Sequence, residues 1–261
     1  MLVDSHCHLD FPDFDDDRDA IVQRARDAGL VRMVTICTRV RKFAQVLAVA
    51  DGYPDIFCSV GTHPHNSHEE LDIGVDELIE KSTHPKVVAI GEAGLDYYYR
   101  KDHAEAQAQH FAVHIEAARR TGLPLVIHSR DADDDMIDIL ERETANGAFP
   151  FVLHCFSSGA QLAEIGVSLG GYVSFSGIAA FKRSDSLREI AAKVPAERVL
   201  METDAPYLAP PPNRGKRNEP GFVADTAAIL AKHLNVDFNA FAAQTTENFY
   251  RLFSKVPRHD D

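Results

Sequence analysis

The feature that most constrains the fold is a regular alternation of short apolar runs and longer helical patterns. Eight runs rich in β-branched or other apolar residues recur, and their ends lie roughly 20 to 37 residues apart, the length of a βα unit. The eight runs are Leu2–Ser5, Val31–Cys37, Ile56–Gly61, Val87–Gly91, Pro124–His128, Phe151–His154, Gly171–Phe175 and Arg198–Glu202. Strands that alternate with helices form parallel sheets, because each helix returns the chain to the start of the next strand.

Helical patterns occupy most of the gaps between these runs. The predicted helices are Asp16–Ala28, Val40–Asp51, Ala104–Thr121, Asp133–Thr144, Gln161–Leu169, Ser184–Val194, Val223–His233 and Phe238–Phe253. Eight strands with intervening helices predict an α/β fold, a (β/α)8 TIM barrel in a single domain over residues 1–261, since such barrels commonly span about 250 residues. An open doubly wound sheet is the alternative, which the lack of a G-x-G-x-x-G motif after the first run weakens.

Composition indicates a soluble globular protein. Hydrophobic residues make up 45% of the chain, which supports a large core, and no apolar run approaches the roughly 20 residues that span a bilayer. The segment Met1–Asp10 carries acids and histidines where a secretory signal would carry basic residues and a long apolar stretch. The four cysteines are dispersed, which favours free thiols in a reducing compartment. We therefore expect a cytoplasmic protein with no membrane partner.

The net charge of −13 bears on any nucleic-acid substrate. Proteins that bind nucleic acids tightly usually present a basic surface, and this chain has no global excess of basic residues. Attraction to a polyanion would have to be local, from metal ions and a few arginines.

Residue types that bind metals stand at the carboxyl ends of six of the eight predicted strands. Active sites of (β/α)8 barrels are built at this end. His6 and His8 are two residues apart on a strand, so their side chains point the same way. A lone histidine is more often a satisfied polar residue than a ligand, but scattered histidines have no reason to choose this position. The joint pattern predicts a metal site whose ligands are His6, His8, Glu92, His128, His154 and Asp204.

This ligand set is too large for one tetrahedral zinc ion. Four histidines and two carboxylates suit two divalent ions about 3.5 to 4 Å apart that share a carboxylate. We predict that Glu92 is the bridge, that one site is completed by His6, His8 and Asp204, and that the other is completed by His128 and His154. Two such ions and two carboxylates leave a net charge of about +2, which would attract an anion.

The same residues suggest a hydrolytic mechanism as a hypothesis. Two-metal sites activate water and stabilise charge on the leaving oxygen. Glu92 and Asp204 are the predicted catalytic residues, and Asp204 would orient the water or accept its proton. His63, placed at the rim, would donate a hydrogen bond to a phosphate oxygen. The nitrogen and oxygen ligands suit zinc, manganese, nickel or magnesium.

Six stretches of the chain also match the motifs of a known family, in the family's order. They are Asp4-Ser5-His6-Cys7-His8-Leu9-Asp10, Gly61-Thr62-His63-Pro64-His65, Gly91-Glu92-Ala93-Gly94-Leu95-Asp96-Tyr97, His128-Ser129-Arg130, His154-Cys155-Phe156-Ser157-Ser158-Gly159 and Glu202-Thr203-Asp204-Ala205-Pro206-Tyr207-Leu208. The chain resembles the TatD family of metal-dependent deoxyribonucleases, and Asn218-Glu219-Pro220 matches as well. The resemblance implies a (β/α)8 barrel, a two-metal site and 3′-to-5′ exodeoxyribonuclease activity supported by magnesium.

Further residues are candidates for substrate binding. Arg130 would grip a phosphate through its guanidinium group, or form a surface salt bridge with Asp131 or Asp133. Tyr97 is the candidate for stacking on a base, with packing of the loop as the alternative. Its neighbours Tyr98 and Tyr99 cannot all face the same way as Tyr97.

Two more pairs have a functional and an ordinary interpretation. Arg214 and Arg217 would hold a nucleic-acid backbone or belong to a solvated loop. His110 and His114 share a helix face away from the strand ends, and we interpret them as an ordinary solvated pair.

Three functions are consistent with these residues. The first is a monomeric nuclease that cleaves DNA, single-stranded or at 3′ ends. The second is a hydrolase of an amide or ester such as D-aminoacyl-tRNA. Many amide-cleaving barrels bridge their metals with a carboxylated lysine on strand four, and this chain offers Glu92 there. The third is a non-catalytic protein with a structural metal, which would have a closed, fully coordinated site.

Overall fold

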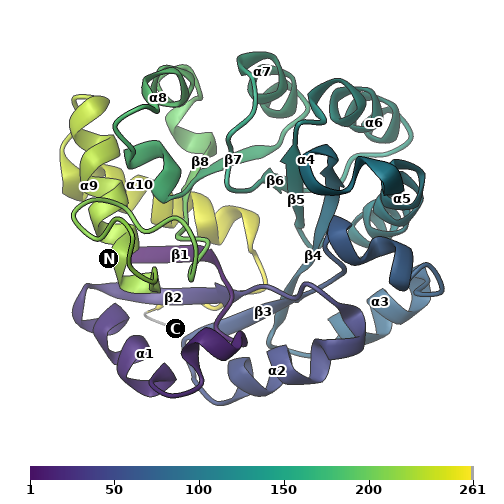
Figure 1. The fold of residues 1–261 in the computed structure, drawn as a ribbon, viewed down its shortest axis with the longest axis horizontal. Helices are drawn as coiled ribbons and strands as arrows, with labels where there is room; N and C mark the ends of the chain where they lie inside the picture. The colour runs from purple at the N-terminus through teal and green to yellow at the C-terminus, as the bar shows by residue number, and fades with distance from the viewer. Residues whose placement is uncertain (260–261) are drawn as a thin grey trace.

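Eight strands pair in parallel, in the order of the sequence, to form a nearly closed barrel (Figure 1). The computed structural model describes residues 1–259, so the last two positions of the predicted domain, 260 and 261, lie outside the described residues. The strands are β1 (Leu2–Cys7), β2 (Leu30–Thr35), β3 (Ile56–Val60), β4 (Val87–Asp96), β5 (Leu125–Arg130), β6 (Phe151–Leu153), β7 (Tyr172–Phe175) and β8 (Val199–Met201). The (β/α)8 prediction is confirmed, and each strand overlaps one of the eight apolar runs.

Helices surround the barrel and cover its outer face (Figure 1). They are α1 (Arg18–Asp27), α2 (Phe43–Asp51), α3 (Val75–Ser82), α5 (Ala104–Thr121), α6 (Asp133–Ala145), α7 (Ala160–Ser168), α8 (Asp185–Ala191) and α9 (Val223–His233). Helix α3 was not predicted, because it has only eight residues and buries only Leu78 and Ser82. Such a short segment shows too few turns for a clear helical period.

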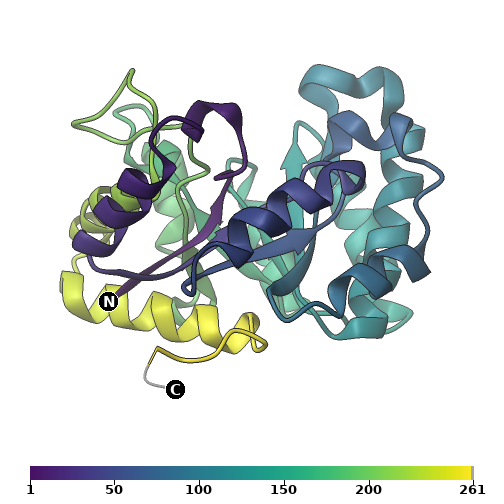
Figure 2. The ribbon, with the colours of Figure 1, turned by 90° about the horizontal axis from the view of Figure 1, so that it is seen from below.

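The last helix, α10 (Phe238–Leu252), lies across the end of the barrel at which the strands begin (Figure 2). Phe249 and Phe253 are buried there in one cluster with apolar side chains from all eight strands, such as Val3, Val126 and Leu200. The barrel is therefore filled from this end by side chains, and only the opposite end is available for a site.

Backbone hydrogen bonds after β8 close the barrel at that opposite end. Cys7 and Ala205 form an isolated parallel bridge, and the His8 amide donates to the Ala205 carbonyl oxygen at 2.8 Å. The buried Asp4 carboxylate accepts hydrogen bonds from the Thr203 amide at 2.9 Å and the Thr203 hydroxyl at 2.5 Å. This seam fixes the segment after β8 against the end of β1.

Among residues 1–259, no helix combines the length and the apolar character needed to cross a membrane. All four cysteines are free, as the dispersed sequence positions predicted.

Candidate metal centre

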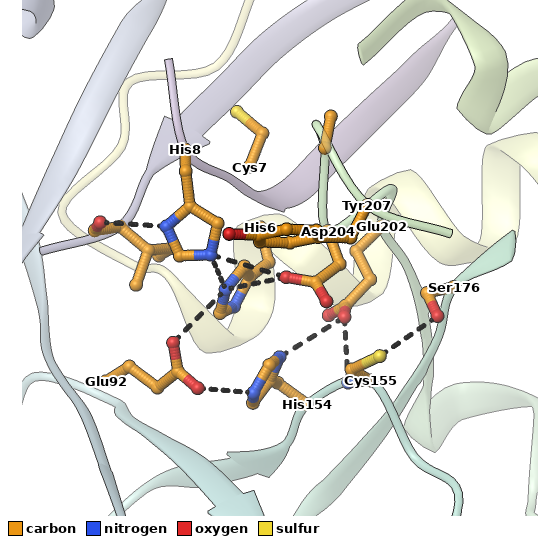
Figure 3. A network of polar contacts seen from close by, with 12 residues as sticks. His6, Cys7, His8, Glu92, His154, Cys155, Ser176, Glu202, Asp204 and Tyr207 are labelled. Carbon is orange, nitrogen blue, oxygen red and sulfur yellow. Dashed lines mark hydrogen bonds and ion pairs between the residues drawn. The ribbon is translucent and has the colours of Figure 1, made fainter. Parts of the chain in front are cut away.

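The Glu92 carboxylate lies among histidines where β4 passes the mouth of the barrel (Figure 3). Its Oε2 atom is 3.5 Å from His6 Nε2. Its Oε1 atom is 2.8 Å from both His128 Nδ1 and His154 Nε2. The two oxygens of one buried carboxylate thus face two different sets of imidazoles, which is the arrangement expected of a bridging ligand.

Asp204 stands on the His6 side of Glu92. Its Oδ1 atom lies 3.5 Å from His6 Nε2 and 3.3 Å from His8 Nε2. The Asp204 amide donates to the His6 carbonyl oxygen at 2.9 Å, so the seam that closes the barrel also places this carboxylate. The other ring nitrogen of His8, Nδ1, lies 3.2 Å from the Ile36 carbonyl oxygen. Since a carbonyl only accepts, His8 carries a proton on Nδ1, which leaves Nε2, on the Asp204 side, as the atom that would bind a metal.

Carboxylates orient the two histidines on the other side in the same way. His128 Nε2 lies 3.1 Å from Asp96 Oδ2, and His154 Nδ1 lies 3.3 Å from Glu202 Oε1. His128 Nδ1 and His154 Nε2 are 3.3 Å apart, and each lies 2.8 Å from Glu92 Oε1, as nitrogens that donate to this carboxylate do. A metal ion would replace the protons on these two nitrogens, while the outer N–H groups stay paired with Asp96 and Glu202. Metal-binding histidines characteristically donate their second N–H to a carboxylate or carbonyl.

The interior of the cluster is therefore lined by imidazole nitrogens and carboxylate oxygens, a donor set that fits divalent cations once the ring protons are displaced. Within residues 1–259, three groups have ligand atoms close enough to hold an ion, namely His6, His8 and Glu92; His63, Glu92 and His128; and His6, His154 and Glu202. Two of these groups share Glu92. The structure brings together all six predicted ligands, and their binding of metal stays a prediction.

Charge coupling within the cluster is strong. Burial alone would raise the pKa of Glu92, but the coulombic interaction with His154 and the hydrogen bonds from His128 and His154 outweigh it and hold this pKa well below its usual range. Burial opposes protonation of His154 as well, yet Glu92 and Glu202 raise its pKa well above the usual value. The pKa of His128 is raised against burial by Asp96 and Glu92. Glu92 is therefore anionic at neutral pH and available to a cation.

His63 lies within the cluster, whereas the sequence placed it at the rim. Its Nε2 atom is 3.4 Å from Glu92 Oε1, and its ring centroid is 4.6 Å from that of His128. The cause is local, because His63 is the N-cap of the 3-10 helix Pro64–Glu69 and its Nδ1 accepts a hydrogen bond from the His65 amide at 3.1 Å. An accepting Nδ1 leaves the proton on Nε2, so neutral His63 presents a hydrogen-bond donor to the site.

The comparisons with known proteins agree with this geometry. The family model described as TatD related DNase matches residues 3–254. The chain belongs to the TatD-related DNase family. It is 38% identical over 256 residues to the metal-dependent hydrolase YcfH of Escherichia coli K12, covering 97% of this chain and 96% of the relative. It is 36% identical over 253 residues to the metal-dependent hydrolase YabD of Bacillus subtilis strain 168, covering 97% and 99%.

A solved structure is similar along the whole chain. The crystal structure of YJJV, a TatD homologue from Escherichia coli K12, superposes with a TM-score of 0.90 at 33% identity and covers 98% of each chain. This protein is therefore a TatD-family metal-dependent hydrolase on a (β/α)8 barrel, as the motifs indicated.

The predicted substrate-binding residues occupy different environments in this TatD-family hydrolase. Among residues 1–259, Arg130 forms no ion pair with Asp131 or Asp133. Its guanidinium stands over the rings of Tyr98 at 4.1 Å and Tyr99 at 4.8 Å. Tyr97 is half-buried against the core, and its hydroxyl donates to Asp135 at 2.6 Å. The exposed rings of this segment are those of its two neighbours.

The two arginines after β8 also differ from each other. Arg217 pairs with Asp17, its Nη2 lying 2.7 Å from Oδ2. Arg214 is exposed, and its guanidinium stands over the Phe181 ring at 3.6 Å from the centroid. Of these two arginines, Arg214 is the one whose charge no carboxylate among the described residues neutralises.

The interpretation of His110 and His114 as a solvated pair is wrong, because both side chains are buried. His114 Nε2 accepts from the Thr62 amide at 3.1 Å, and its Nδ1 lies 2.8 Å from the His110 carbonyl oxygen. The ring thus ties α5 to the loop after β3 that carries His63. The spacing of His110 and His114 shows that they share a face of α5, but it does not show whether that face is buried or exposed.

Residues outside the predicted ligand set also shape the site. Asp96 and Glu202 were present in the matched motifs, but nothing in the sequence showed that they would lie behind His128 and His154. Asn218 has a structural place, because its side-chain amide donates to the carbonyl oxygens of Thr203 at 3.0 Å and Tyr207 at 2.6 Å. It therefore holds the segment that carries Asp204.

Proposed function

We propose that this hydrolase is a two-metal phosphodiesterase that degrades DNA, as a 3′-to-5′ exonuclease. The observation that carries the proposal is the Glu92 carboxylate, whose two oxygens face separate sets of imidazole nitrogens. His6, His8 and Asp204 would hold one ion with Glu92, and His128 and His154 would hold the other. Magnesium, manganese and zinc are the ions to test.

When bound, two divalent ions supply Lewis-acid charge that activates water and offsets negative charge on a phosphoryl group. Asp204 accepts the proton of the attacking water, since its carboxylate is partly exposed at the mouth while Glu92 is buried. His63 donates its Nε2 hydrogen to a phosphoryl oxygen. Arg130 follows His128 by two residues on β5 and presents an unneutralised guanidinium to a neighbouring phosphate.

Two observations support a phosphodiester over an amide or ester. The residue between the two sets of histidines is a glutamate, whereas a carboxylated lysine serves many amide-cleaving barrels. Cations and donors at the mouth, Arg130 and His63 among them, suit an anionic substrate. The family description also names a DNase. The four free cysteines suit a reducing compartment, so we place this activity in the cytoplasm.

The experiment is cleavage of single-stranded DNA labelled at either the 3′ or the 5′ end. Metal-stripped protein is supplied with magnesium, manganese or zinc, and bound metal is counted. Glu92→Ala tests the bridging ligand, and Asp204→Asn, of nearly equal size, tests the proton acceptor. Glu164→Gln on the exposed face of α7 is the matched control.

Metal-dependent shortening from the 3′ end that disappears in Glu92→Ala would support the proposal. Full activity of Asp204→Asn with both ions bound would remove Asp204 from its role. Absence of cleavage by protein that binds two ions would overturn the nuclease function, and D-aminoacyl-tRNA and small amides would then be assayed.

A further inference from the structure

Two exposed aromatic groups stand on the mouth of the barrel. The first, here called the Arg130 station, consists of Tyr98, Tyr99 and Arg130. The two rings are nearly perpendicular, with centroids 4.6 Å apart, and the guanidinium lies over both. Tyr98 is 58% exposed and Tyr99 is 59% exposed, so each ring retains a large open surface.

The second group, here called the Tyr207 station, consists of Tyr207 and Phe11. Tyr207 is 54% exposed, and its ring meets Phe11 edge-on with centroids 6.4 Å apart. Phe11 stacks on His8 at 4.6 Å with an interplanar angle of 15°. Asn218 holds the Tyr207 backbone, so this ring is presented by a fixed segment.

Each station adjoins one side of the metal centre. Tyr207 contacts His8 directly, with ring centroids 6.5 Å apart. On the other side, Asp96 accepts a hydrogen bond from the Tyr99 amide through Oδ1 at 3.0 Å, while its Oδ2 lies 3.1 Å from His128. The Tyr99 ring also meets His65 edge-on at 5.3 Å. The same carboxylate therefore places both the Arg130 station and a proposed ligand.

The topology puts the stations opposite each other. The Arg130 station comes from the ends of β4 and β5, and the Tyr207 station comes from the segments after β8 and β1, which are half the barrel away in the strand order. Figure 2 shows α4 (Tyr97–Arg100) and the loop after β8 on opposite sides of the same end of the molecule. A chain that crosses the metal centre would meet one station on each side.

Packing alone gives a poor account of these rings. Four aromatic side chains are exposed among residues 1–259, and three of them are the tyrosines of the two stations. The fourth, Phe238, begins α10 at the opposite end of the barrel. Open aromatic faces beside a cationic group form the usual platform for unpaired nucleobases, since every base has a face that can stack.

We propose that the Arg130 and Tyr207 stations stack the two nucleobases that flank the scissile phosphodiester, one base on each station. The inference rests on the proposed nuclease function and adds what the enzyme recognises, which is an unpaired base on each side of the bond. A base inside a duplex is stacked on its neighbours, so its faces are not available to these rings. Loss of one station weakens binding on the order of tenfold.

The test is a cycle between protein variants and abasic substrates, with the metal-loaded enzyme. The variants are Tyr98→Leu/Tyr99→Leu and Tyr207→Leu, which change exposed side chains only, and Phe238→Leu is the matched control. Each is assayed for kcat/KM on a single-stranded oligonucleotide with all bases, and on oligonucleotides that lack the base on one or the other side of the terminal phosphodiester.

In the wild type, loss of either base should lower kcat/KM about tenfold. In a variant that lacks one station, kcat/KM should not fall further when the base that stacks on that station is also missing, because the stacking contact is already lost. Additive effects, or station variants that match Phe238→Leu on every substrate, would overturn the proposal while leaving the nuclease function intact.

A second readout does not require cleavage. An uncleavable phosphorothioate oligonucleotide with 2-aminopurine as its terminal or penultimate base should lose fluorescence on binding to the wild type, and one station variant should restore each signal. Unquenched emission from bound oligonucleotide would contradict stacking. If the enzyme cleaves no DNA, the nuclease function fails, and this binding measurement alone then decides whether the stations hold bases.

Discussion

The Glu202 carboxylate lies behind the His154 ring, with Oε1 3.3 Å from Nδ1, while the opposite nitrogen of that ring lies 2.8 Å from Glu92. Glu202 is fully buried, and its Oε1 also accepts the Cys155 amide at 2.7 Å. It thus fixes both the tautomer and the direction of a proposed metal ligand without facing Glu92 itself.

We expect Glu202→Gln to lower metal affinity 10- to 100-fold, the usual cost of losing a carboxylate behind a metal-bound histidine. Glutamine keeps the size and an acceptor for Cys155, so the fold should persist by circular dichroism. Titration calorimetry with zinc and manganese measures the change, and Glu164→Gln is the control. Equal affinity in both variants would show that His154 needs no such partner.

A glycine sets the position of another proposed ligand. Gly94 has φ +147°, and a β-carbon built on it would lie 2.0 Å from the His128 carbonyl oxygen on the neighbouring strand. Gly94→Ala should therefore force β4 and β5 apart at His128 and destabilise the protein by about 2–4 kcal/mol, with loss of metal-dependent activity.

Urea denaturation and hydrolysis assays check this prediction. Gly74→Ala is the matched control, because a β-carbon there meets nothing within 4 Å and the variant should lose only about 1 kcal/mol, from the poorer N-cap of α3. If the two alanine variants had the same stability and activity, the close approach of Gly94 to His128 would have no consequence.

The sequence predicted the barrel and the convergence of the ligands for the same physical reason. The apolar runs predict where the strands lie, and their alternation with helices predicts that the strands are parallel. Parallel strands bring their carboxyl ends, and the ligands that follow them, to one rim of the barrel. The direction of a side chain in a loop depends on local backbone geometry, so it was not predictable from spacing. His63 turned inward because it starts a 3-10 helix, and Tyr97 turned toward the core while Tyr98 and Tyr99 faced solvent.

Burial of His114 makes a prediction about acid stability. Burial lowers the pKa of His114 from 6.5 to about 3. Between these values the unfolded chain binds a proton that the folded protein does not, so stability is complete above pH 6.5 and falls as the pH drops toward 3. From pH 7 to pH 5 this residue should cost the wild type about 2 kcal/mol.

His114→Gln removes that titration. At pH 7 the variant should be less stable by about 1–3 kcal/mol, because the Thr62 amide loses its acceptor. At pH 5 the gap between variant and wild type should narrow by about 2 kcal/mol. Urea denaturation of both proteins at pH 7 and pH 5, with chelator present, measures this difference in stability. Exposed His233→Gln serves as control, and a gap that stays constant with pH would refute the account.

The guanidinium of Arg130 should contribute one charge to DNA binding. It is stacked on Tyr98 and Tyr99 and has no carboxylate partner among the described residues, whereas the Arg217 charge is already neutralised by Asp17. Each phosphate contact to single-stranded DNA adds about −0.7 to the slope of log K against log salt. Arg130→Gln should therefore weaken binding at low salt and make this slope shallower by about 0.7.

Arg217→Gln removes the same formal charge and provides the matched comparison. Its slope should stay that of the wild type, because the paired guanidinium displaces few counterions from DNA. Fluorescence anisotropy of an uncleavable oligonucleotide over a range of salt concentrations gives both slopes. If both variants shifted the slope equally, net charge and not the Arg130 station would govern attraction of DNA to this acidic protein.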